Sequence, residues 1–335
     1  DDAGYLISRN AERHLVDCAE AERRWRHVPD ALDGASTLAN LCHFSMDDLS
    51  YEYPDELKPG GRTAMQELAF QTWRGAEKRY PDAIPDKVSA YLKHELILIE
   101  RLNIAPYFLT VFDIVRFARG RGILCQGRGS AANSAVCYCL GITAVDPERS
   151  QPLFERFVSE ARGEPPDIDV DFEHERREEV IQHIYTKYGR NRAGLTASVI
   201  TYRRRSAFRE VAKVFGLSRD VQAALAGEVW GREKTGIDAA ALAAVGLDAN
   251  DRRLRLVLQL VADISRFPRH LSQHVGGFVI VRGRLDHLCP ISPAAITGRT
   301  VIEWDKDDLD ALGFLKVDVL ALGMLSCIRR SFDLL

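Results

Sequence analysis

The stretch Pro165-Pro166-Asp167-Ile168-Asp169-Val170-Asp171-Phe172 alternates carboxylates with large apolar side chains. Successive side chains of a β-strand point to opposite faces, so one face of this stretch would be acidic and the other would be buried in a core. Carboxylates at this spacing repel each other unless a cation lies among them, and hard divalent cations such as Mg²⁺ take oxygen ligands. The stretch therefore predicts a strand that carries a metal site.

Two other interpretations fit some features of the same stretch. It imitates the calcium-binding loop of an EF-hand, with carboxylates at the first, third, fifth and twelfth positions: Asp167, Asp169, Asp171 and Glu178. However, Phe172 stands where that loop needs glycine for a sharp turn, and the apolar residues between the carboxylates favour an extended strand. The remaining alternative is an acidic edge strand that is merely solvated.

The composition is that of an ordinary globular protein with room for two or three domains: 335 residues, 46% hydrophobic and 28% charged. Because the formal net charge is only -3, affinity for nucleic acid would have to come from a local basic patch. The seven cysteines are scattered without C-x-x-C spacing, which favours reduced thiols and a cytoplasmic location. No apolar run reaches membrane-spanning length, and the absence of an initiator methionine leads us to expect a piece of a longer protein.

Two other segments carry groups suited to phosphate chemistry. A short strand at residues 122–126 leads through Gly127-Arg128-Gly129-Ser130 into a small-residue helix at residues 131–140. A helix start offers free backbone N–H groups to phosphate, although an ordinary tight turn fits equally well and no Walker A lysine follows. A second strand at residues 314–320 places Lys316 and Asp318 on one face.

A basic segment begins near residue 198. Six cationic side chains and two carboxylates occur between residues 203 and 220, which predicts either a helix that contacts DNA phosphates or a solvated helix face. Downstream, His270 and His274 are four residues apart, but Leu271 replaces the glutamate of a zinc-protease helix, so packing or turn roles are favoured.

The rest of the chain is mainly helical in pattern. Helical periodicity covers residues 8–49, 63–80, 85–102, 110–119, 173–188 and 220–261, with an acidic helix start at 304–310. Residues 51–61 form a turn-rich connector, and residues 274–281 form a buried strand.

These segments together resemble the bacterial C-family DNA polymerases, which comprise the replicative polymerase III alpha subunit and its error-prone paralogue. The resemblance is carried by residues 127–130, Leu153-Phe154-Glu155-Arg156-Phe157, residues 166–172 and Leu315-Lys316-Val317-Asp318. Residues 200–206, 269–277 and 301–308 are more similar to the error-prone branch than to the replicative one.

The resemblance implies an α+β fold: a polymerase beta-like nucleotidyltransferase palm, with a mixed sheet and flanking helices, interrupted by an inserted all-α thumb. The implied domains are a helical tail of the PHP domain or a connector at 1–50, a first palm segment at 51–198, the thumb at 199–272 and a second palm segment at 273–335. The chain would end before the family's fingers, clamp-binding segment and C-terminal modules, so we expect it to polymerise poorly by itself.

The resemblance also implies roles for individual residues. Asp167, Asp169 and Asp318 would be the catalytic carboxylates that bind two Mg²⁺ ions, for which Mn²⁺ could substitute, with Asp171 on the same face but outside this group. The nucleotide phosphates would contact Arg128, Gly129, Ser130, Arg156 and Lys316. The primer–template backbone would lie near Arg203, Arg204, Arg205 and Arg209.

The implied activity is templated DNA synthesis from deoxynucleoside triphosphates in DNA repair, translesion synthesis or damage-induced mutagenesis. The implied partners are primer–template DNA and, through segments outside this chain, a sliding clamp and damage-response accessory proteins, with no membrane. The alternatives are the replicative alpha subunit and a non-catalytic DNA-binding module that keeps the palm and thumb. A nucleotidyltransferase without a template is disfavoured because it has less need for the arginine-rich segment.

Overall fold

The acidic stretch forms strand β2 (Ile168–Glu173) in the computed structural model of this chain. The structure describes residues 14–54, 61–150, 152–158, 166–228 and 250–335, together with residues 243, 246 and 248; for residues 224–228 it describes the backbone alone. The predicted helical residues 8–13 and 229–242 and the connector residues 55–60 therefore lie outside the described residues. The chain divides into two units, Asp1–Ser50 and Tyr51–Leu335.

In the described part of the first unit, residues 14–50, the chain forms short helices without a core of their own. They are α1 (Cys18–Trp25), α2 (Pro29–Leu41) and the 3-10 helix η2 (Met46–Asp48). The Asp17 side chain caps α1 by accepting a hydrogen bond from Glu20 N at 2.8 Å, and proline opens α2. No residue of α1, α2 or η2 is buried. The helices predicted for this region of the chain are confirmed within residues 14–50.

The second unit is built on a seven-stranded mixed sheet with the order β1-β2-β7-β4-β3-β6-β5. The other strands are β1 (Cys125–Arg128), β3 (Ala193–Thr201), β4 (Pro268–Ile280), β5 (Ile291–Pro293), β6 (Thr300–Ile302) and β7 (Lys316–Leu322). The pairs β2–β7 and β3–β6 are parallel, and the other neighbours are antiparallel. The predicted mixed sheet with flanking helices is confirmed at this level.

Strand β2 divides its side chains between two environments, as its alternation predicts. Ile168, Val170 and Phe172 are fully buried in the main core. The EF-hand interpretation is wrong, because these residues are in a strand and Glu178 forms an ion pair with Arg299. Burying the apolar face fixes the register of β2 and therefore the face on which its carboxylates lie.

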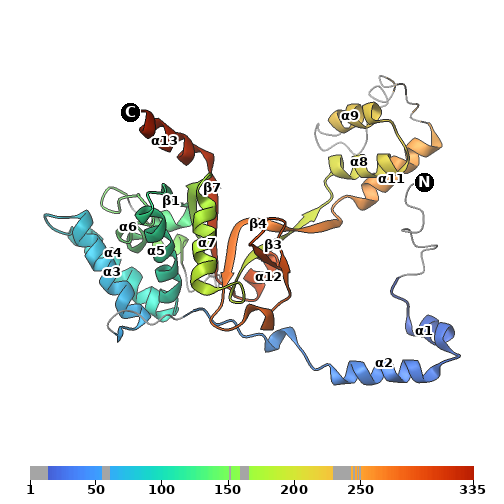
Figure 1. The fold of residues 1–335 in the computed structure, drawn as a ribbon, viewed down its shortest axis with the longest axis horizontal. Helices are drawn as coiled ribbons and strands as arrows, with labels where there is room; N and C mark the ends of the chain where they lie inside the picture. Colours follow the sequence, from blue (N-terminus) through green and yellow to red (C-terminus); the bar gives the residue numbers. More distant parts are fainter. Residues whose placement is uncertain are drawn as a thin grey trace. The chain divides into compact units, whose positions relative to one another are not determined.

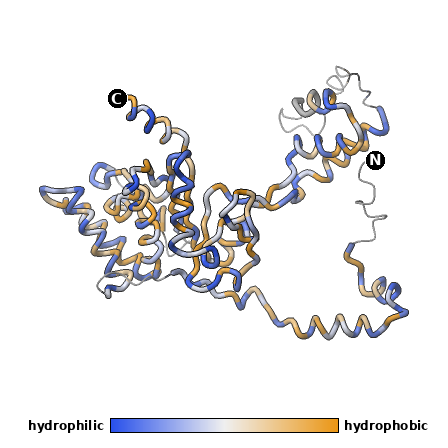
Figure 2. The backbone as a smooth tube through the Cα atoms, in the orientation of Figure 1, coloured by the Kyte–Doolittle hydropathy of each residue, from blue (hydrophilic) through white to orange (hydrophobic). Residues whose placement is uncertain are grey.

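Helices cover the β1–β2–β7 region of the sheet (Figure 1). They are α3 (Ala64–Arg79), α4 (Asp86–Arg101), α5 (Ala105–Gly120), α6 (Ala135–Cys139) and α7 (Arg177–Tyr188). Along α3 and α4 apolar and polar residues alternate at helical spacing (Figure 2), as predicted. Helix α5 begins earlier than predicted because Pro106 is tolerated in its first turn. Among the described residues, no helix is both long and apolar enough to cross a membrane.

The glycine loop and its helix differ from the prediction. Strand β1 begins at Cys125, three residues after the start of the predicted strand, and ends at Arg128, two residues after its predicted end. The predicted helix at residues 131–140 is divided into the 3-10 helix η4 (Gly129–Asn133) and the short helix α6. The division occurs at Ser134, which has an extended backbone and caps α6 by accepting a hydrogen bond from Cys137 N.

The basic segment leads into a separate helical cluster. Helices α8 (Arg204–Val214), α9 (Arg219–Glu228) and α11 (Arg252–Ile264) belong to it. Phe208, Leu254 and Val257 are buried together in this cluster and form a core distinct from the main one. Strands β3 and β4 connect it to the sheet, and their paired ends reach Thr201 and Pro268. Strand β3 and the first half of β4 were not predicted.

Short elements complete the second unit. They are η5 (Phe154–Arg156), η6 (Leu285–His287), α12 (Lys306–Ala311) and α13 (Gly323–Leu334). The predicted acidic helix start is α12, where the Asp305 side chain accepts hydrogen bonds from Asp307 N and Asp308 N.

Gly75 allows α3 to approach α6 closely. A Cβ atom at this position would lie 2.0 Å from the Cys139 carbonyl oxygen, which is backbone and cannot swing aside. We therefore expect Gly75→Ala to lower the free energy of unfolding by about 2 kcal/mol in urea denaturation. Gly120→Ala is the control, because a Cβ there meets nothing within 4 Å. Equal destabilisation by both variants would contradict the close approach of the two helices.

Candidate metal centre

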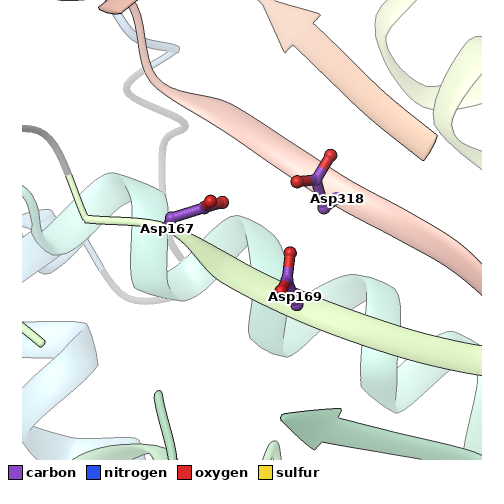
Figure 3. A group of neighbouring side chains, drawn as sticks. All are labelled: Asp167, Asp169 and Asp318. Carbon is purple, nitrogen blue, oxygen red and sulfur yellow. The ribbon is translucent and has the colours of Figure 1, made fainter. Parts of the chain in front are cut away.

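Three carboxylates from two neighbouring strands meet at one place. Strands β2 and β7 are parallel and in a register that sets Asp169 opposite Asp318, while Asp167 immediately precedes β2. One carboxylate oxygen from each residue lies within 4.8 Å of the others (Figure 3). The three residues predicted to form the metal site are therefore brought together by the pairing of β2 with β7.

Lys316 lies among these carboxylates. Its Nζ donates to Asp167 Oδ1 and Oδ2 at 2.9 Å each and to Asp318 Oδ2 at 2.7 Å. Burial opposes the charge of the ammonium, but Asp318 and Asp167 outweigh that effect and raise the pKa of Lys316 to about 12. Its side chain is only 12% exposed, so Lys316 is a fixed positive charge between the two strands.

Asp318 keeps one oxygen without a hydrogen bond. The residue is 4% exposed, and its Oδ1 is buried and has no hydrogen-bond partner among the described residues. The nearest ring nitrogen is His274 Nδ1 at 3.7 Å, which accepts a hydrogen bond from Gly277 N at 2.8 Å. Two acceptors therefore face each other, an arrangement that a cation stabilises. The set of three carboxylates fits a hard divalent ion that takes oxygen ligands.

Repulsion among the carboxylates also affects Asp169. Burial, followed by the negative charges of Asp167 and Asp318, raises the pKa of Asp169 to about 6. Arg128 opposes this shift from the other side. A divalent ion bound by all three carboxylates would stabilise the ionised form of Asp169.

Arg128 lies against the acidic face of β2. Its Nη1 is 3.4 Å from Asp169 Oδ2 and its Nε is 3.1 Å from Asp171 Oδ2. Gly129 follows with a left-handed backbone (φ 71°), and a Cβ there would lie 3.6 Å from Asp169 Oδ2. The structure thus places both residues beside the carboxylates, whereas their predicted contacts with phosphates stay a prediction.

The other residues predicted to contact phosphate lie on η4 and η5. Ser130 Oγ donates a long hydrogen bond of 3.5 Å to the Asp167 carbonyl oxygen, so this residue lies beside the group of three. Arg156 ends η5, which packs against η4. The role predicted for each of them is not tested by these positions.

The start of α6 is not open for phosphate. Glu95 from α4 accepts hydrogen bonds from Ala135 N at 2.7 Å, Val136 N at 3.0 Å and Ser134 Oγ at 2.7 Å. These bonds use the free N–H groups at the start of α6, whereas the predicted helix start at residues 130–131 lies in η4. Burial raises the pKa of Glu95 to about 7, although the same hydrogen bonds lower it. Of these two helix starts, only the backbone of η4 stays available for the predicted binding of phosphate.

The predicted DNA-binding arginines belong to the separate helical cluster. Arg203 precedes α8 and the others lie on it, and all four are exposed: Arg203, Arg204, Arg205 and Arg209. Their exposure fits either interpretation of the basic segment. The histidine pair is on strand β4 and not on a helix, so a zinc-protease arrangement is excluded.

Sequence reasoning missed the proximity of His274 to Asp318. The sequence shows the glycines at 276 and 277, but the proximity of His274 to Asp318 follows only from the β4–β7 register, which pairs Gly277 with Asp318. Glu95 was missed as well, because it looked like one more polar residue of an amphipathic helix. A lone glutamate among apolar helix positions is the only available signal, and it is a weak one.

Comparison with known proteins agrees with this architecture. The sequence profile described as "Bacterial DNA polymerase III alpha NTPase domain" matches residues 66–321. An error-prone DNA polymerase of Ruegeria pomeroyi is 58% identical over 326 residues, which are 97% of this chain and 30% of the relative. An error-prone DNA polymerase of Brucella abortus is 55% identical over 334 residues, 99% of this chain and 31% of the relative.

A third relative, an error-prone DNA polymerase of Rhodopseudomonas palustris, is 55% identical over 335 residues, 100% of this chain and 30% of its own length. The chain thus spans about a third or less of the curated relatives that it matches. The predicted resemblance to the error-prone branch is confirmed by these relatives. On the profile match and these identities, the chain belongs to the bacterial DNA polymerase III alpha family.

Proposed function

We propose that this chain carries the nucleotidyl-transfer site of an error-prone, DNA-directed DNA polymerase. The observation that supports this most strongly is the meeting of Asp167, Asp169 and Asp318 on two adjacent strands. Two-metal phosphoryl transfer needs carboxylates that hold ions close together next to groups that neutralise phosphate. Relatives bearing the name error-prone DNA polymerase support the same reaction class and branch.

In this proposal, the three carboxylates would hold two Mg²⁺ ions, or Mn²⁺ in their place. Bound ions would stabilise the charge that develops on the attacking and leaving oxygens. The primer 3′-hydroxyl would give up its proton to water and form a bond to the α-phosphorus, while the bond from that phosphorus to the oxygen bridging to the β-phosphate would break and pyrophosphate would leave. Lys316 and Arg128 lie within ion-pair distance of these carboxylates. In the complex they would form ion pairs with the triphosphate instead, and Gly129, Ser130 and Arg156 would also contact it.

The proposed domains follow the same family comparison. The sheet and its helices at 51–198 and 273–335 would be the palm, residues 199–272 the thumb, and residues 1–50 the helical tail of the PHP domain. The separate core of α8, α9 and α11 supports an inserted helical domain. The activity of the whole protein in damage repair or translesion synthesis, and any clamp or accessory partner, would involve residues outside this chain. We expect only weak primer extension by the chain itself.

The experiment uses a fluorescent primer–template with a dideoxy-terminated primer, so that complexes form without turnover. We expect deoxynucleoside triphosphate to bind tightly only with Mg²⁺ or Mn²⁺, and Asp169→Asn to lose this metal dependence while it still binds DNA. Asp171→Asn, on the same face of β2, is the control. If nucleotide binding is indifferent to metal and to Asp169, the polymerase site is not here.

A second function is favoured by the exposed arginines of α8, namely that of a non-catalytic DNA-binding module. This function predicts DNA binding that none of the three carboxylates affects. In the experiment above it would appear as intact DNA binding without any metal-dependent nucleotide complex.

The arginines themselves give a quantitative prediction. Arg205 and Arg209 are exposed on α8 and would contact phosphates without reading bases. We expect Arg205→Ala/Arg209→Ala to make the slope of log affinity against log salt shallower by about 1.8 for duplex DNA, because each phosphate contact contributes about 0.9. Lys93→Ala/Arg149→Ala, exposed cations elsewhere, should leave the slope unchanged in fluorescence anisotropy. An unchanged slope in the first variant would assign the arginines to a solvated face.

A further inference from the structure

A basic hollow lies between α3, α5 and the end of α6, away from the metal centre. It has a volume of about 590 Å³, within the range of pockets that hold a small ligand. Five of its lining side chains are cationic: Arg74, Lys78, Arg79, Arg116 and Arg119. No carboxylate is among the lining residues of the described structure. Like charges gathered around one cavity favour an anion inside it.

The cations of this hollow, which we call the α3–α5 pocket, are only partly neutralised. Arg74 and Lys78 form no ion pair with any residue that the structure describes. Arg116 pairs with Asp113 at 2.7 Å, but the same carboxylate also pairs with Lys187 at 2.8 Å. The positive charge of the pocket therefore exceeds the negative charge nearby.

Other contacts hold one of the guanidinium groups in position. Arg79 lies over the Tyr138 ring at 4.3 Å and donates to the Thr143 carbonyl oxygen at 3.4 Å. The Arg119 guanidinium lies beside Gly141, where a Cβ would be 2.9 Å from its Nη1. Guanidinium groups held in place lose little freedom when they bind phosphate, and their planar forks match its oxygens.

The floor of the pocket is apolar. Cys139 and Leu140 are buried and line it, together with the half-buried ring of Phe112. Apolar walls reduce the local dielectric constant and strengthen the attraction between the cations and an anion. The combination differs from an ordinary solvated basic surface, which has no hollow.

The α3–α5 pocket and the metal centre share no residue: the pocket is lined from α3, α5 and the end of α6, and the three carboxylates lie on or beside β2 and β7. None of the residues that line the pocket belongs to the β1–β2 pair that holds Arg128 beside Asp169. A ligand in the α3–α5 pocket would thus be distinct from the nucleotide at the carboxylates.

We propose that the α3–α5 pocket binds the polyphosphate group of a nucleotide, or successive phosphates of a nucleic-acid strand, independently of divalent metal. A triphosphate matches the charge and size of the site, with several oxygens for several cations. Such binding would use none of the three carboxylates and is therefore independent of the proposed polymerase reaction.

The test is calorimetric titration of the whole chain in EDTA, which prevents metal-dependent binding at the carboxylates. The probes are inorganic tripolyphosphate, deoxyadenosine triphosphate and a twelve-residue oligothymidylate. We expect Arg74→Glu/Lys78→Glu to weaken binding at least tenfold, because both residues are exposed cations of the pocket. Lys93→Glu/Arg149→Glu, which changes the net charge equally at exposed positions outside the pocket, should retain binding. Arg74→Gln/Lys78→Gln is a milder second variant, and circular dichroism verifies the fold of each.

The titrations distinguish a free nucleotide from a nucleic-acid strand as the ligand, and they also show whether the pocket binds phosphate at all. Binding of tripolyphosphate and the nucleotide with this variant pattern supports a free nucleotide, whereas the same pattern with the oligothymidylate alone supports a strand. Absence of saturable binding, or equal weakening by both charge-reversal variants, would overturn the proposal. Binding that Asp318→Asn removes would also overturn it, since the ligand would then be at the metal centre.

Discussion

Replacing Lys316 with methionine is expected to strengthen Mn²⁺ binding about tenfold and to weaken binding of the deoxynucleoside triphosphate about tenfold. The ammonium of Lys316 touches Asp167 and Asp318, so an ion at the carboxylates competes with it for the same oxygens. Once metal is bound, the displaced ammonium would neutralise phosphate instead. A purely structural lysine would change both affinities in the same direction.

The measurement is a pair of titrations. The first uses Mn²⁺ alone and is monitored by electron paramagnetic resonance, and the second uses nucleotide at saturating Mn²⁺. Lys306→Met is the matched control, because Lys306 is an exposed lysine on α12 that pairs with Asp307 at 3.5 Å. Metal binding that weakens in Lys316→Met would contradict competition between the lysine and the ion.

Replacing Glu95 with alanine is expected to lower the free energy of unfolding by about 3 kcal/mol at pH 5, where the side chain of the folded chain is protonated. Two backbone N–H groups of α6 and the Ser134 hydroxyl would lose their acceptor in a buried environment. Glu100→Ala, on the exposed side of the same helix, should cost less than about 0.5 kcal/mol. Similar values for the two variants in urea denaturation would show that the carboxylate does not support α6.

Glu95 also predicts how stability depends on pH. Burial raises its pKa in the folded chain to about 7, above the ordinary value of 4.5. The folded state therefore binds more protons between these values, and the contribution of Glu95 to stability, about 3 kcal/mol, is lost as the pH rises from about 4.5 through 7. Urea denaturation at pH 5, 6, 7 and 8 should show a shallower pH dependence for Glu95→Gln than for the wild-type chain. An identical dependence would contradict the assignment.

The acidic strand was predictable because the alternation of side chains between the two faces of a strand depends only on neighbouring residues. Apolar residues at every second position of β2 settle which face is buried, so the carboxylates had to share the other face. Helices α3 and α12 were also predictable from neighbouring residues, because Thr63 and Asp305 are residue types that commonly cap the start of a helix.

What the residues alone could not predict depends on long-range pairing. The pairing of β2 with β7, which joins Asp169 to Asp318, was inferred through resemblance and not from spacing. Strand β3 and the first half of β4 were missed because their ends pair with each other outside the core, where Val199 and Leu271 are exposed and alternation gives no signal. The break at Ser134 depends on Glu95, which is 39 residues away in the chain.

The central claim is that β2 and β7 together form one metal site. The most direct measurement is titration of the chain with Mn²⁺ and a deoxynucleoside triphosphate, monitored by electron paramagnetic resonance. The proteins compared are the wild type, Asp167→Asn and Asp318→Asn, with Asp171→Asn as the control. We predict that binding collapses in both of the first two variants and persists in the control, because only the first two remove a ligand from the group of three. Binding that neither Asp167→Asn nor Asp318→Asn changes would contradict the account.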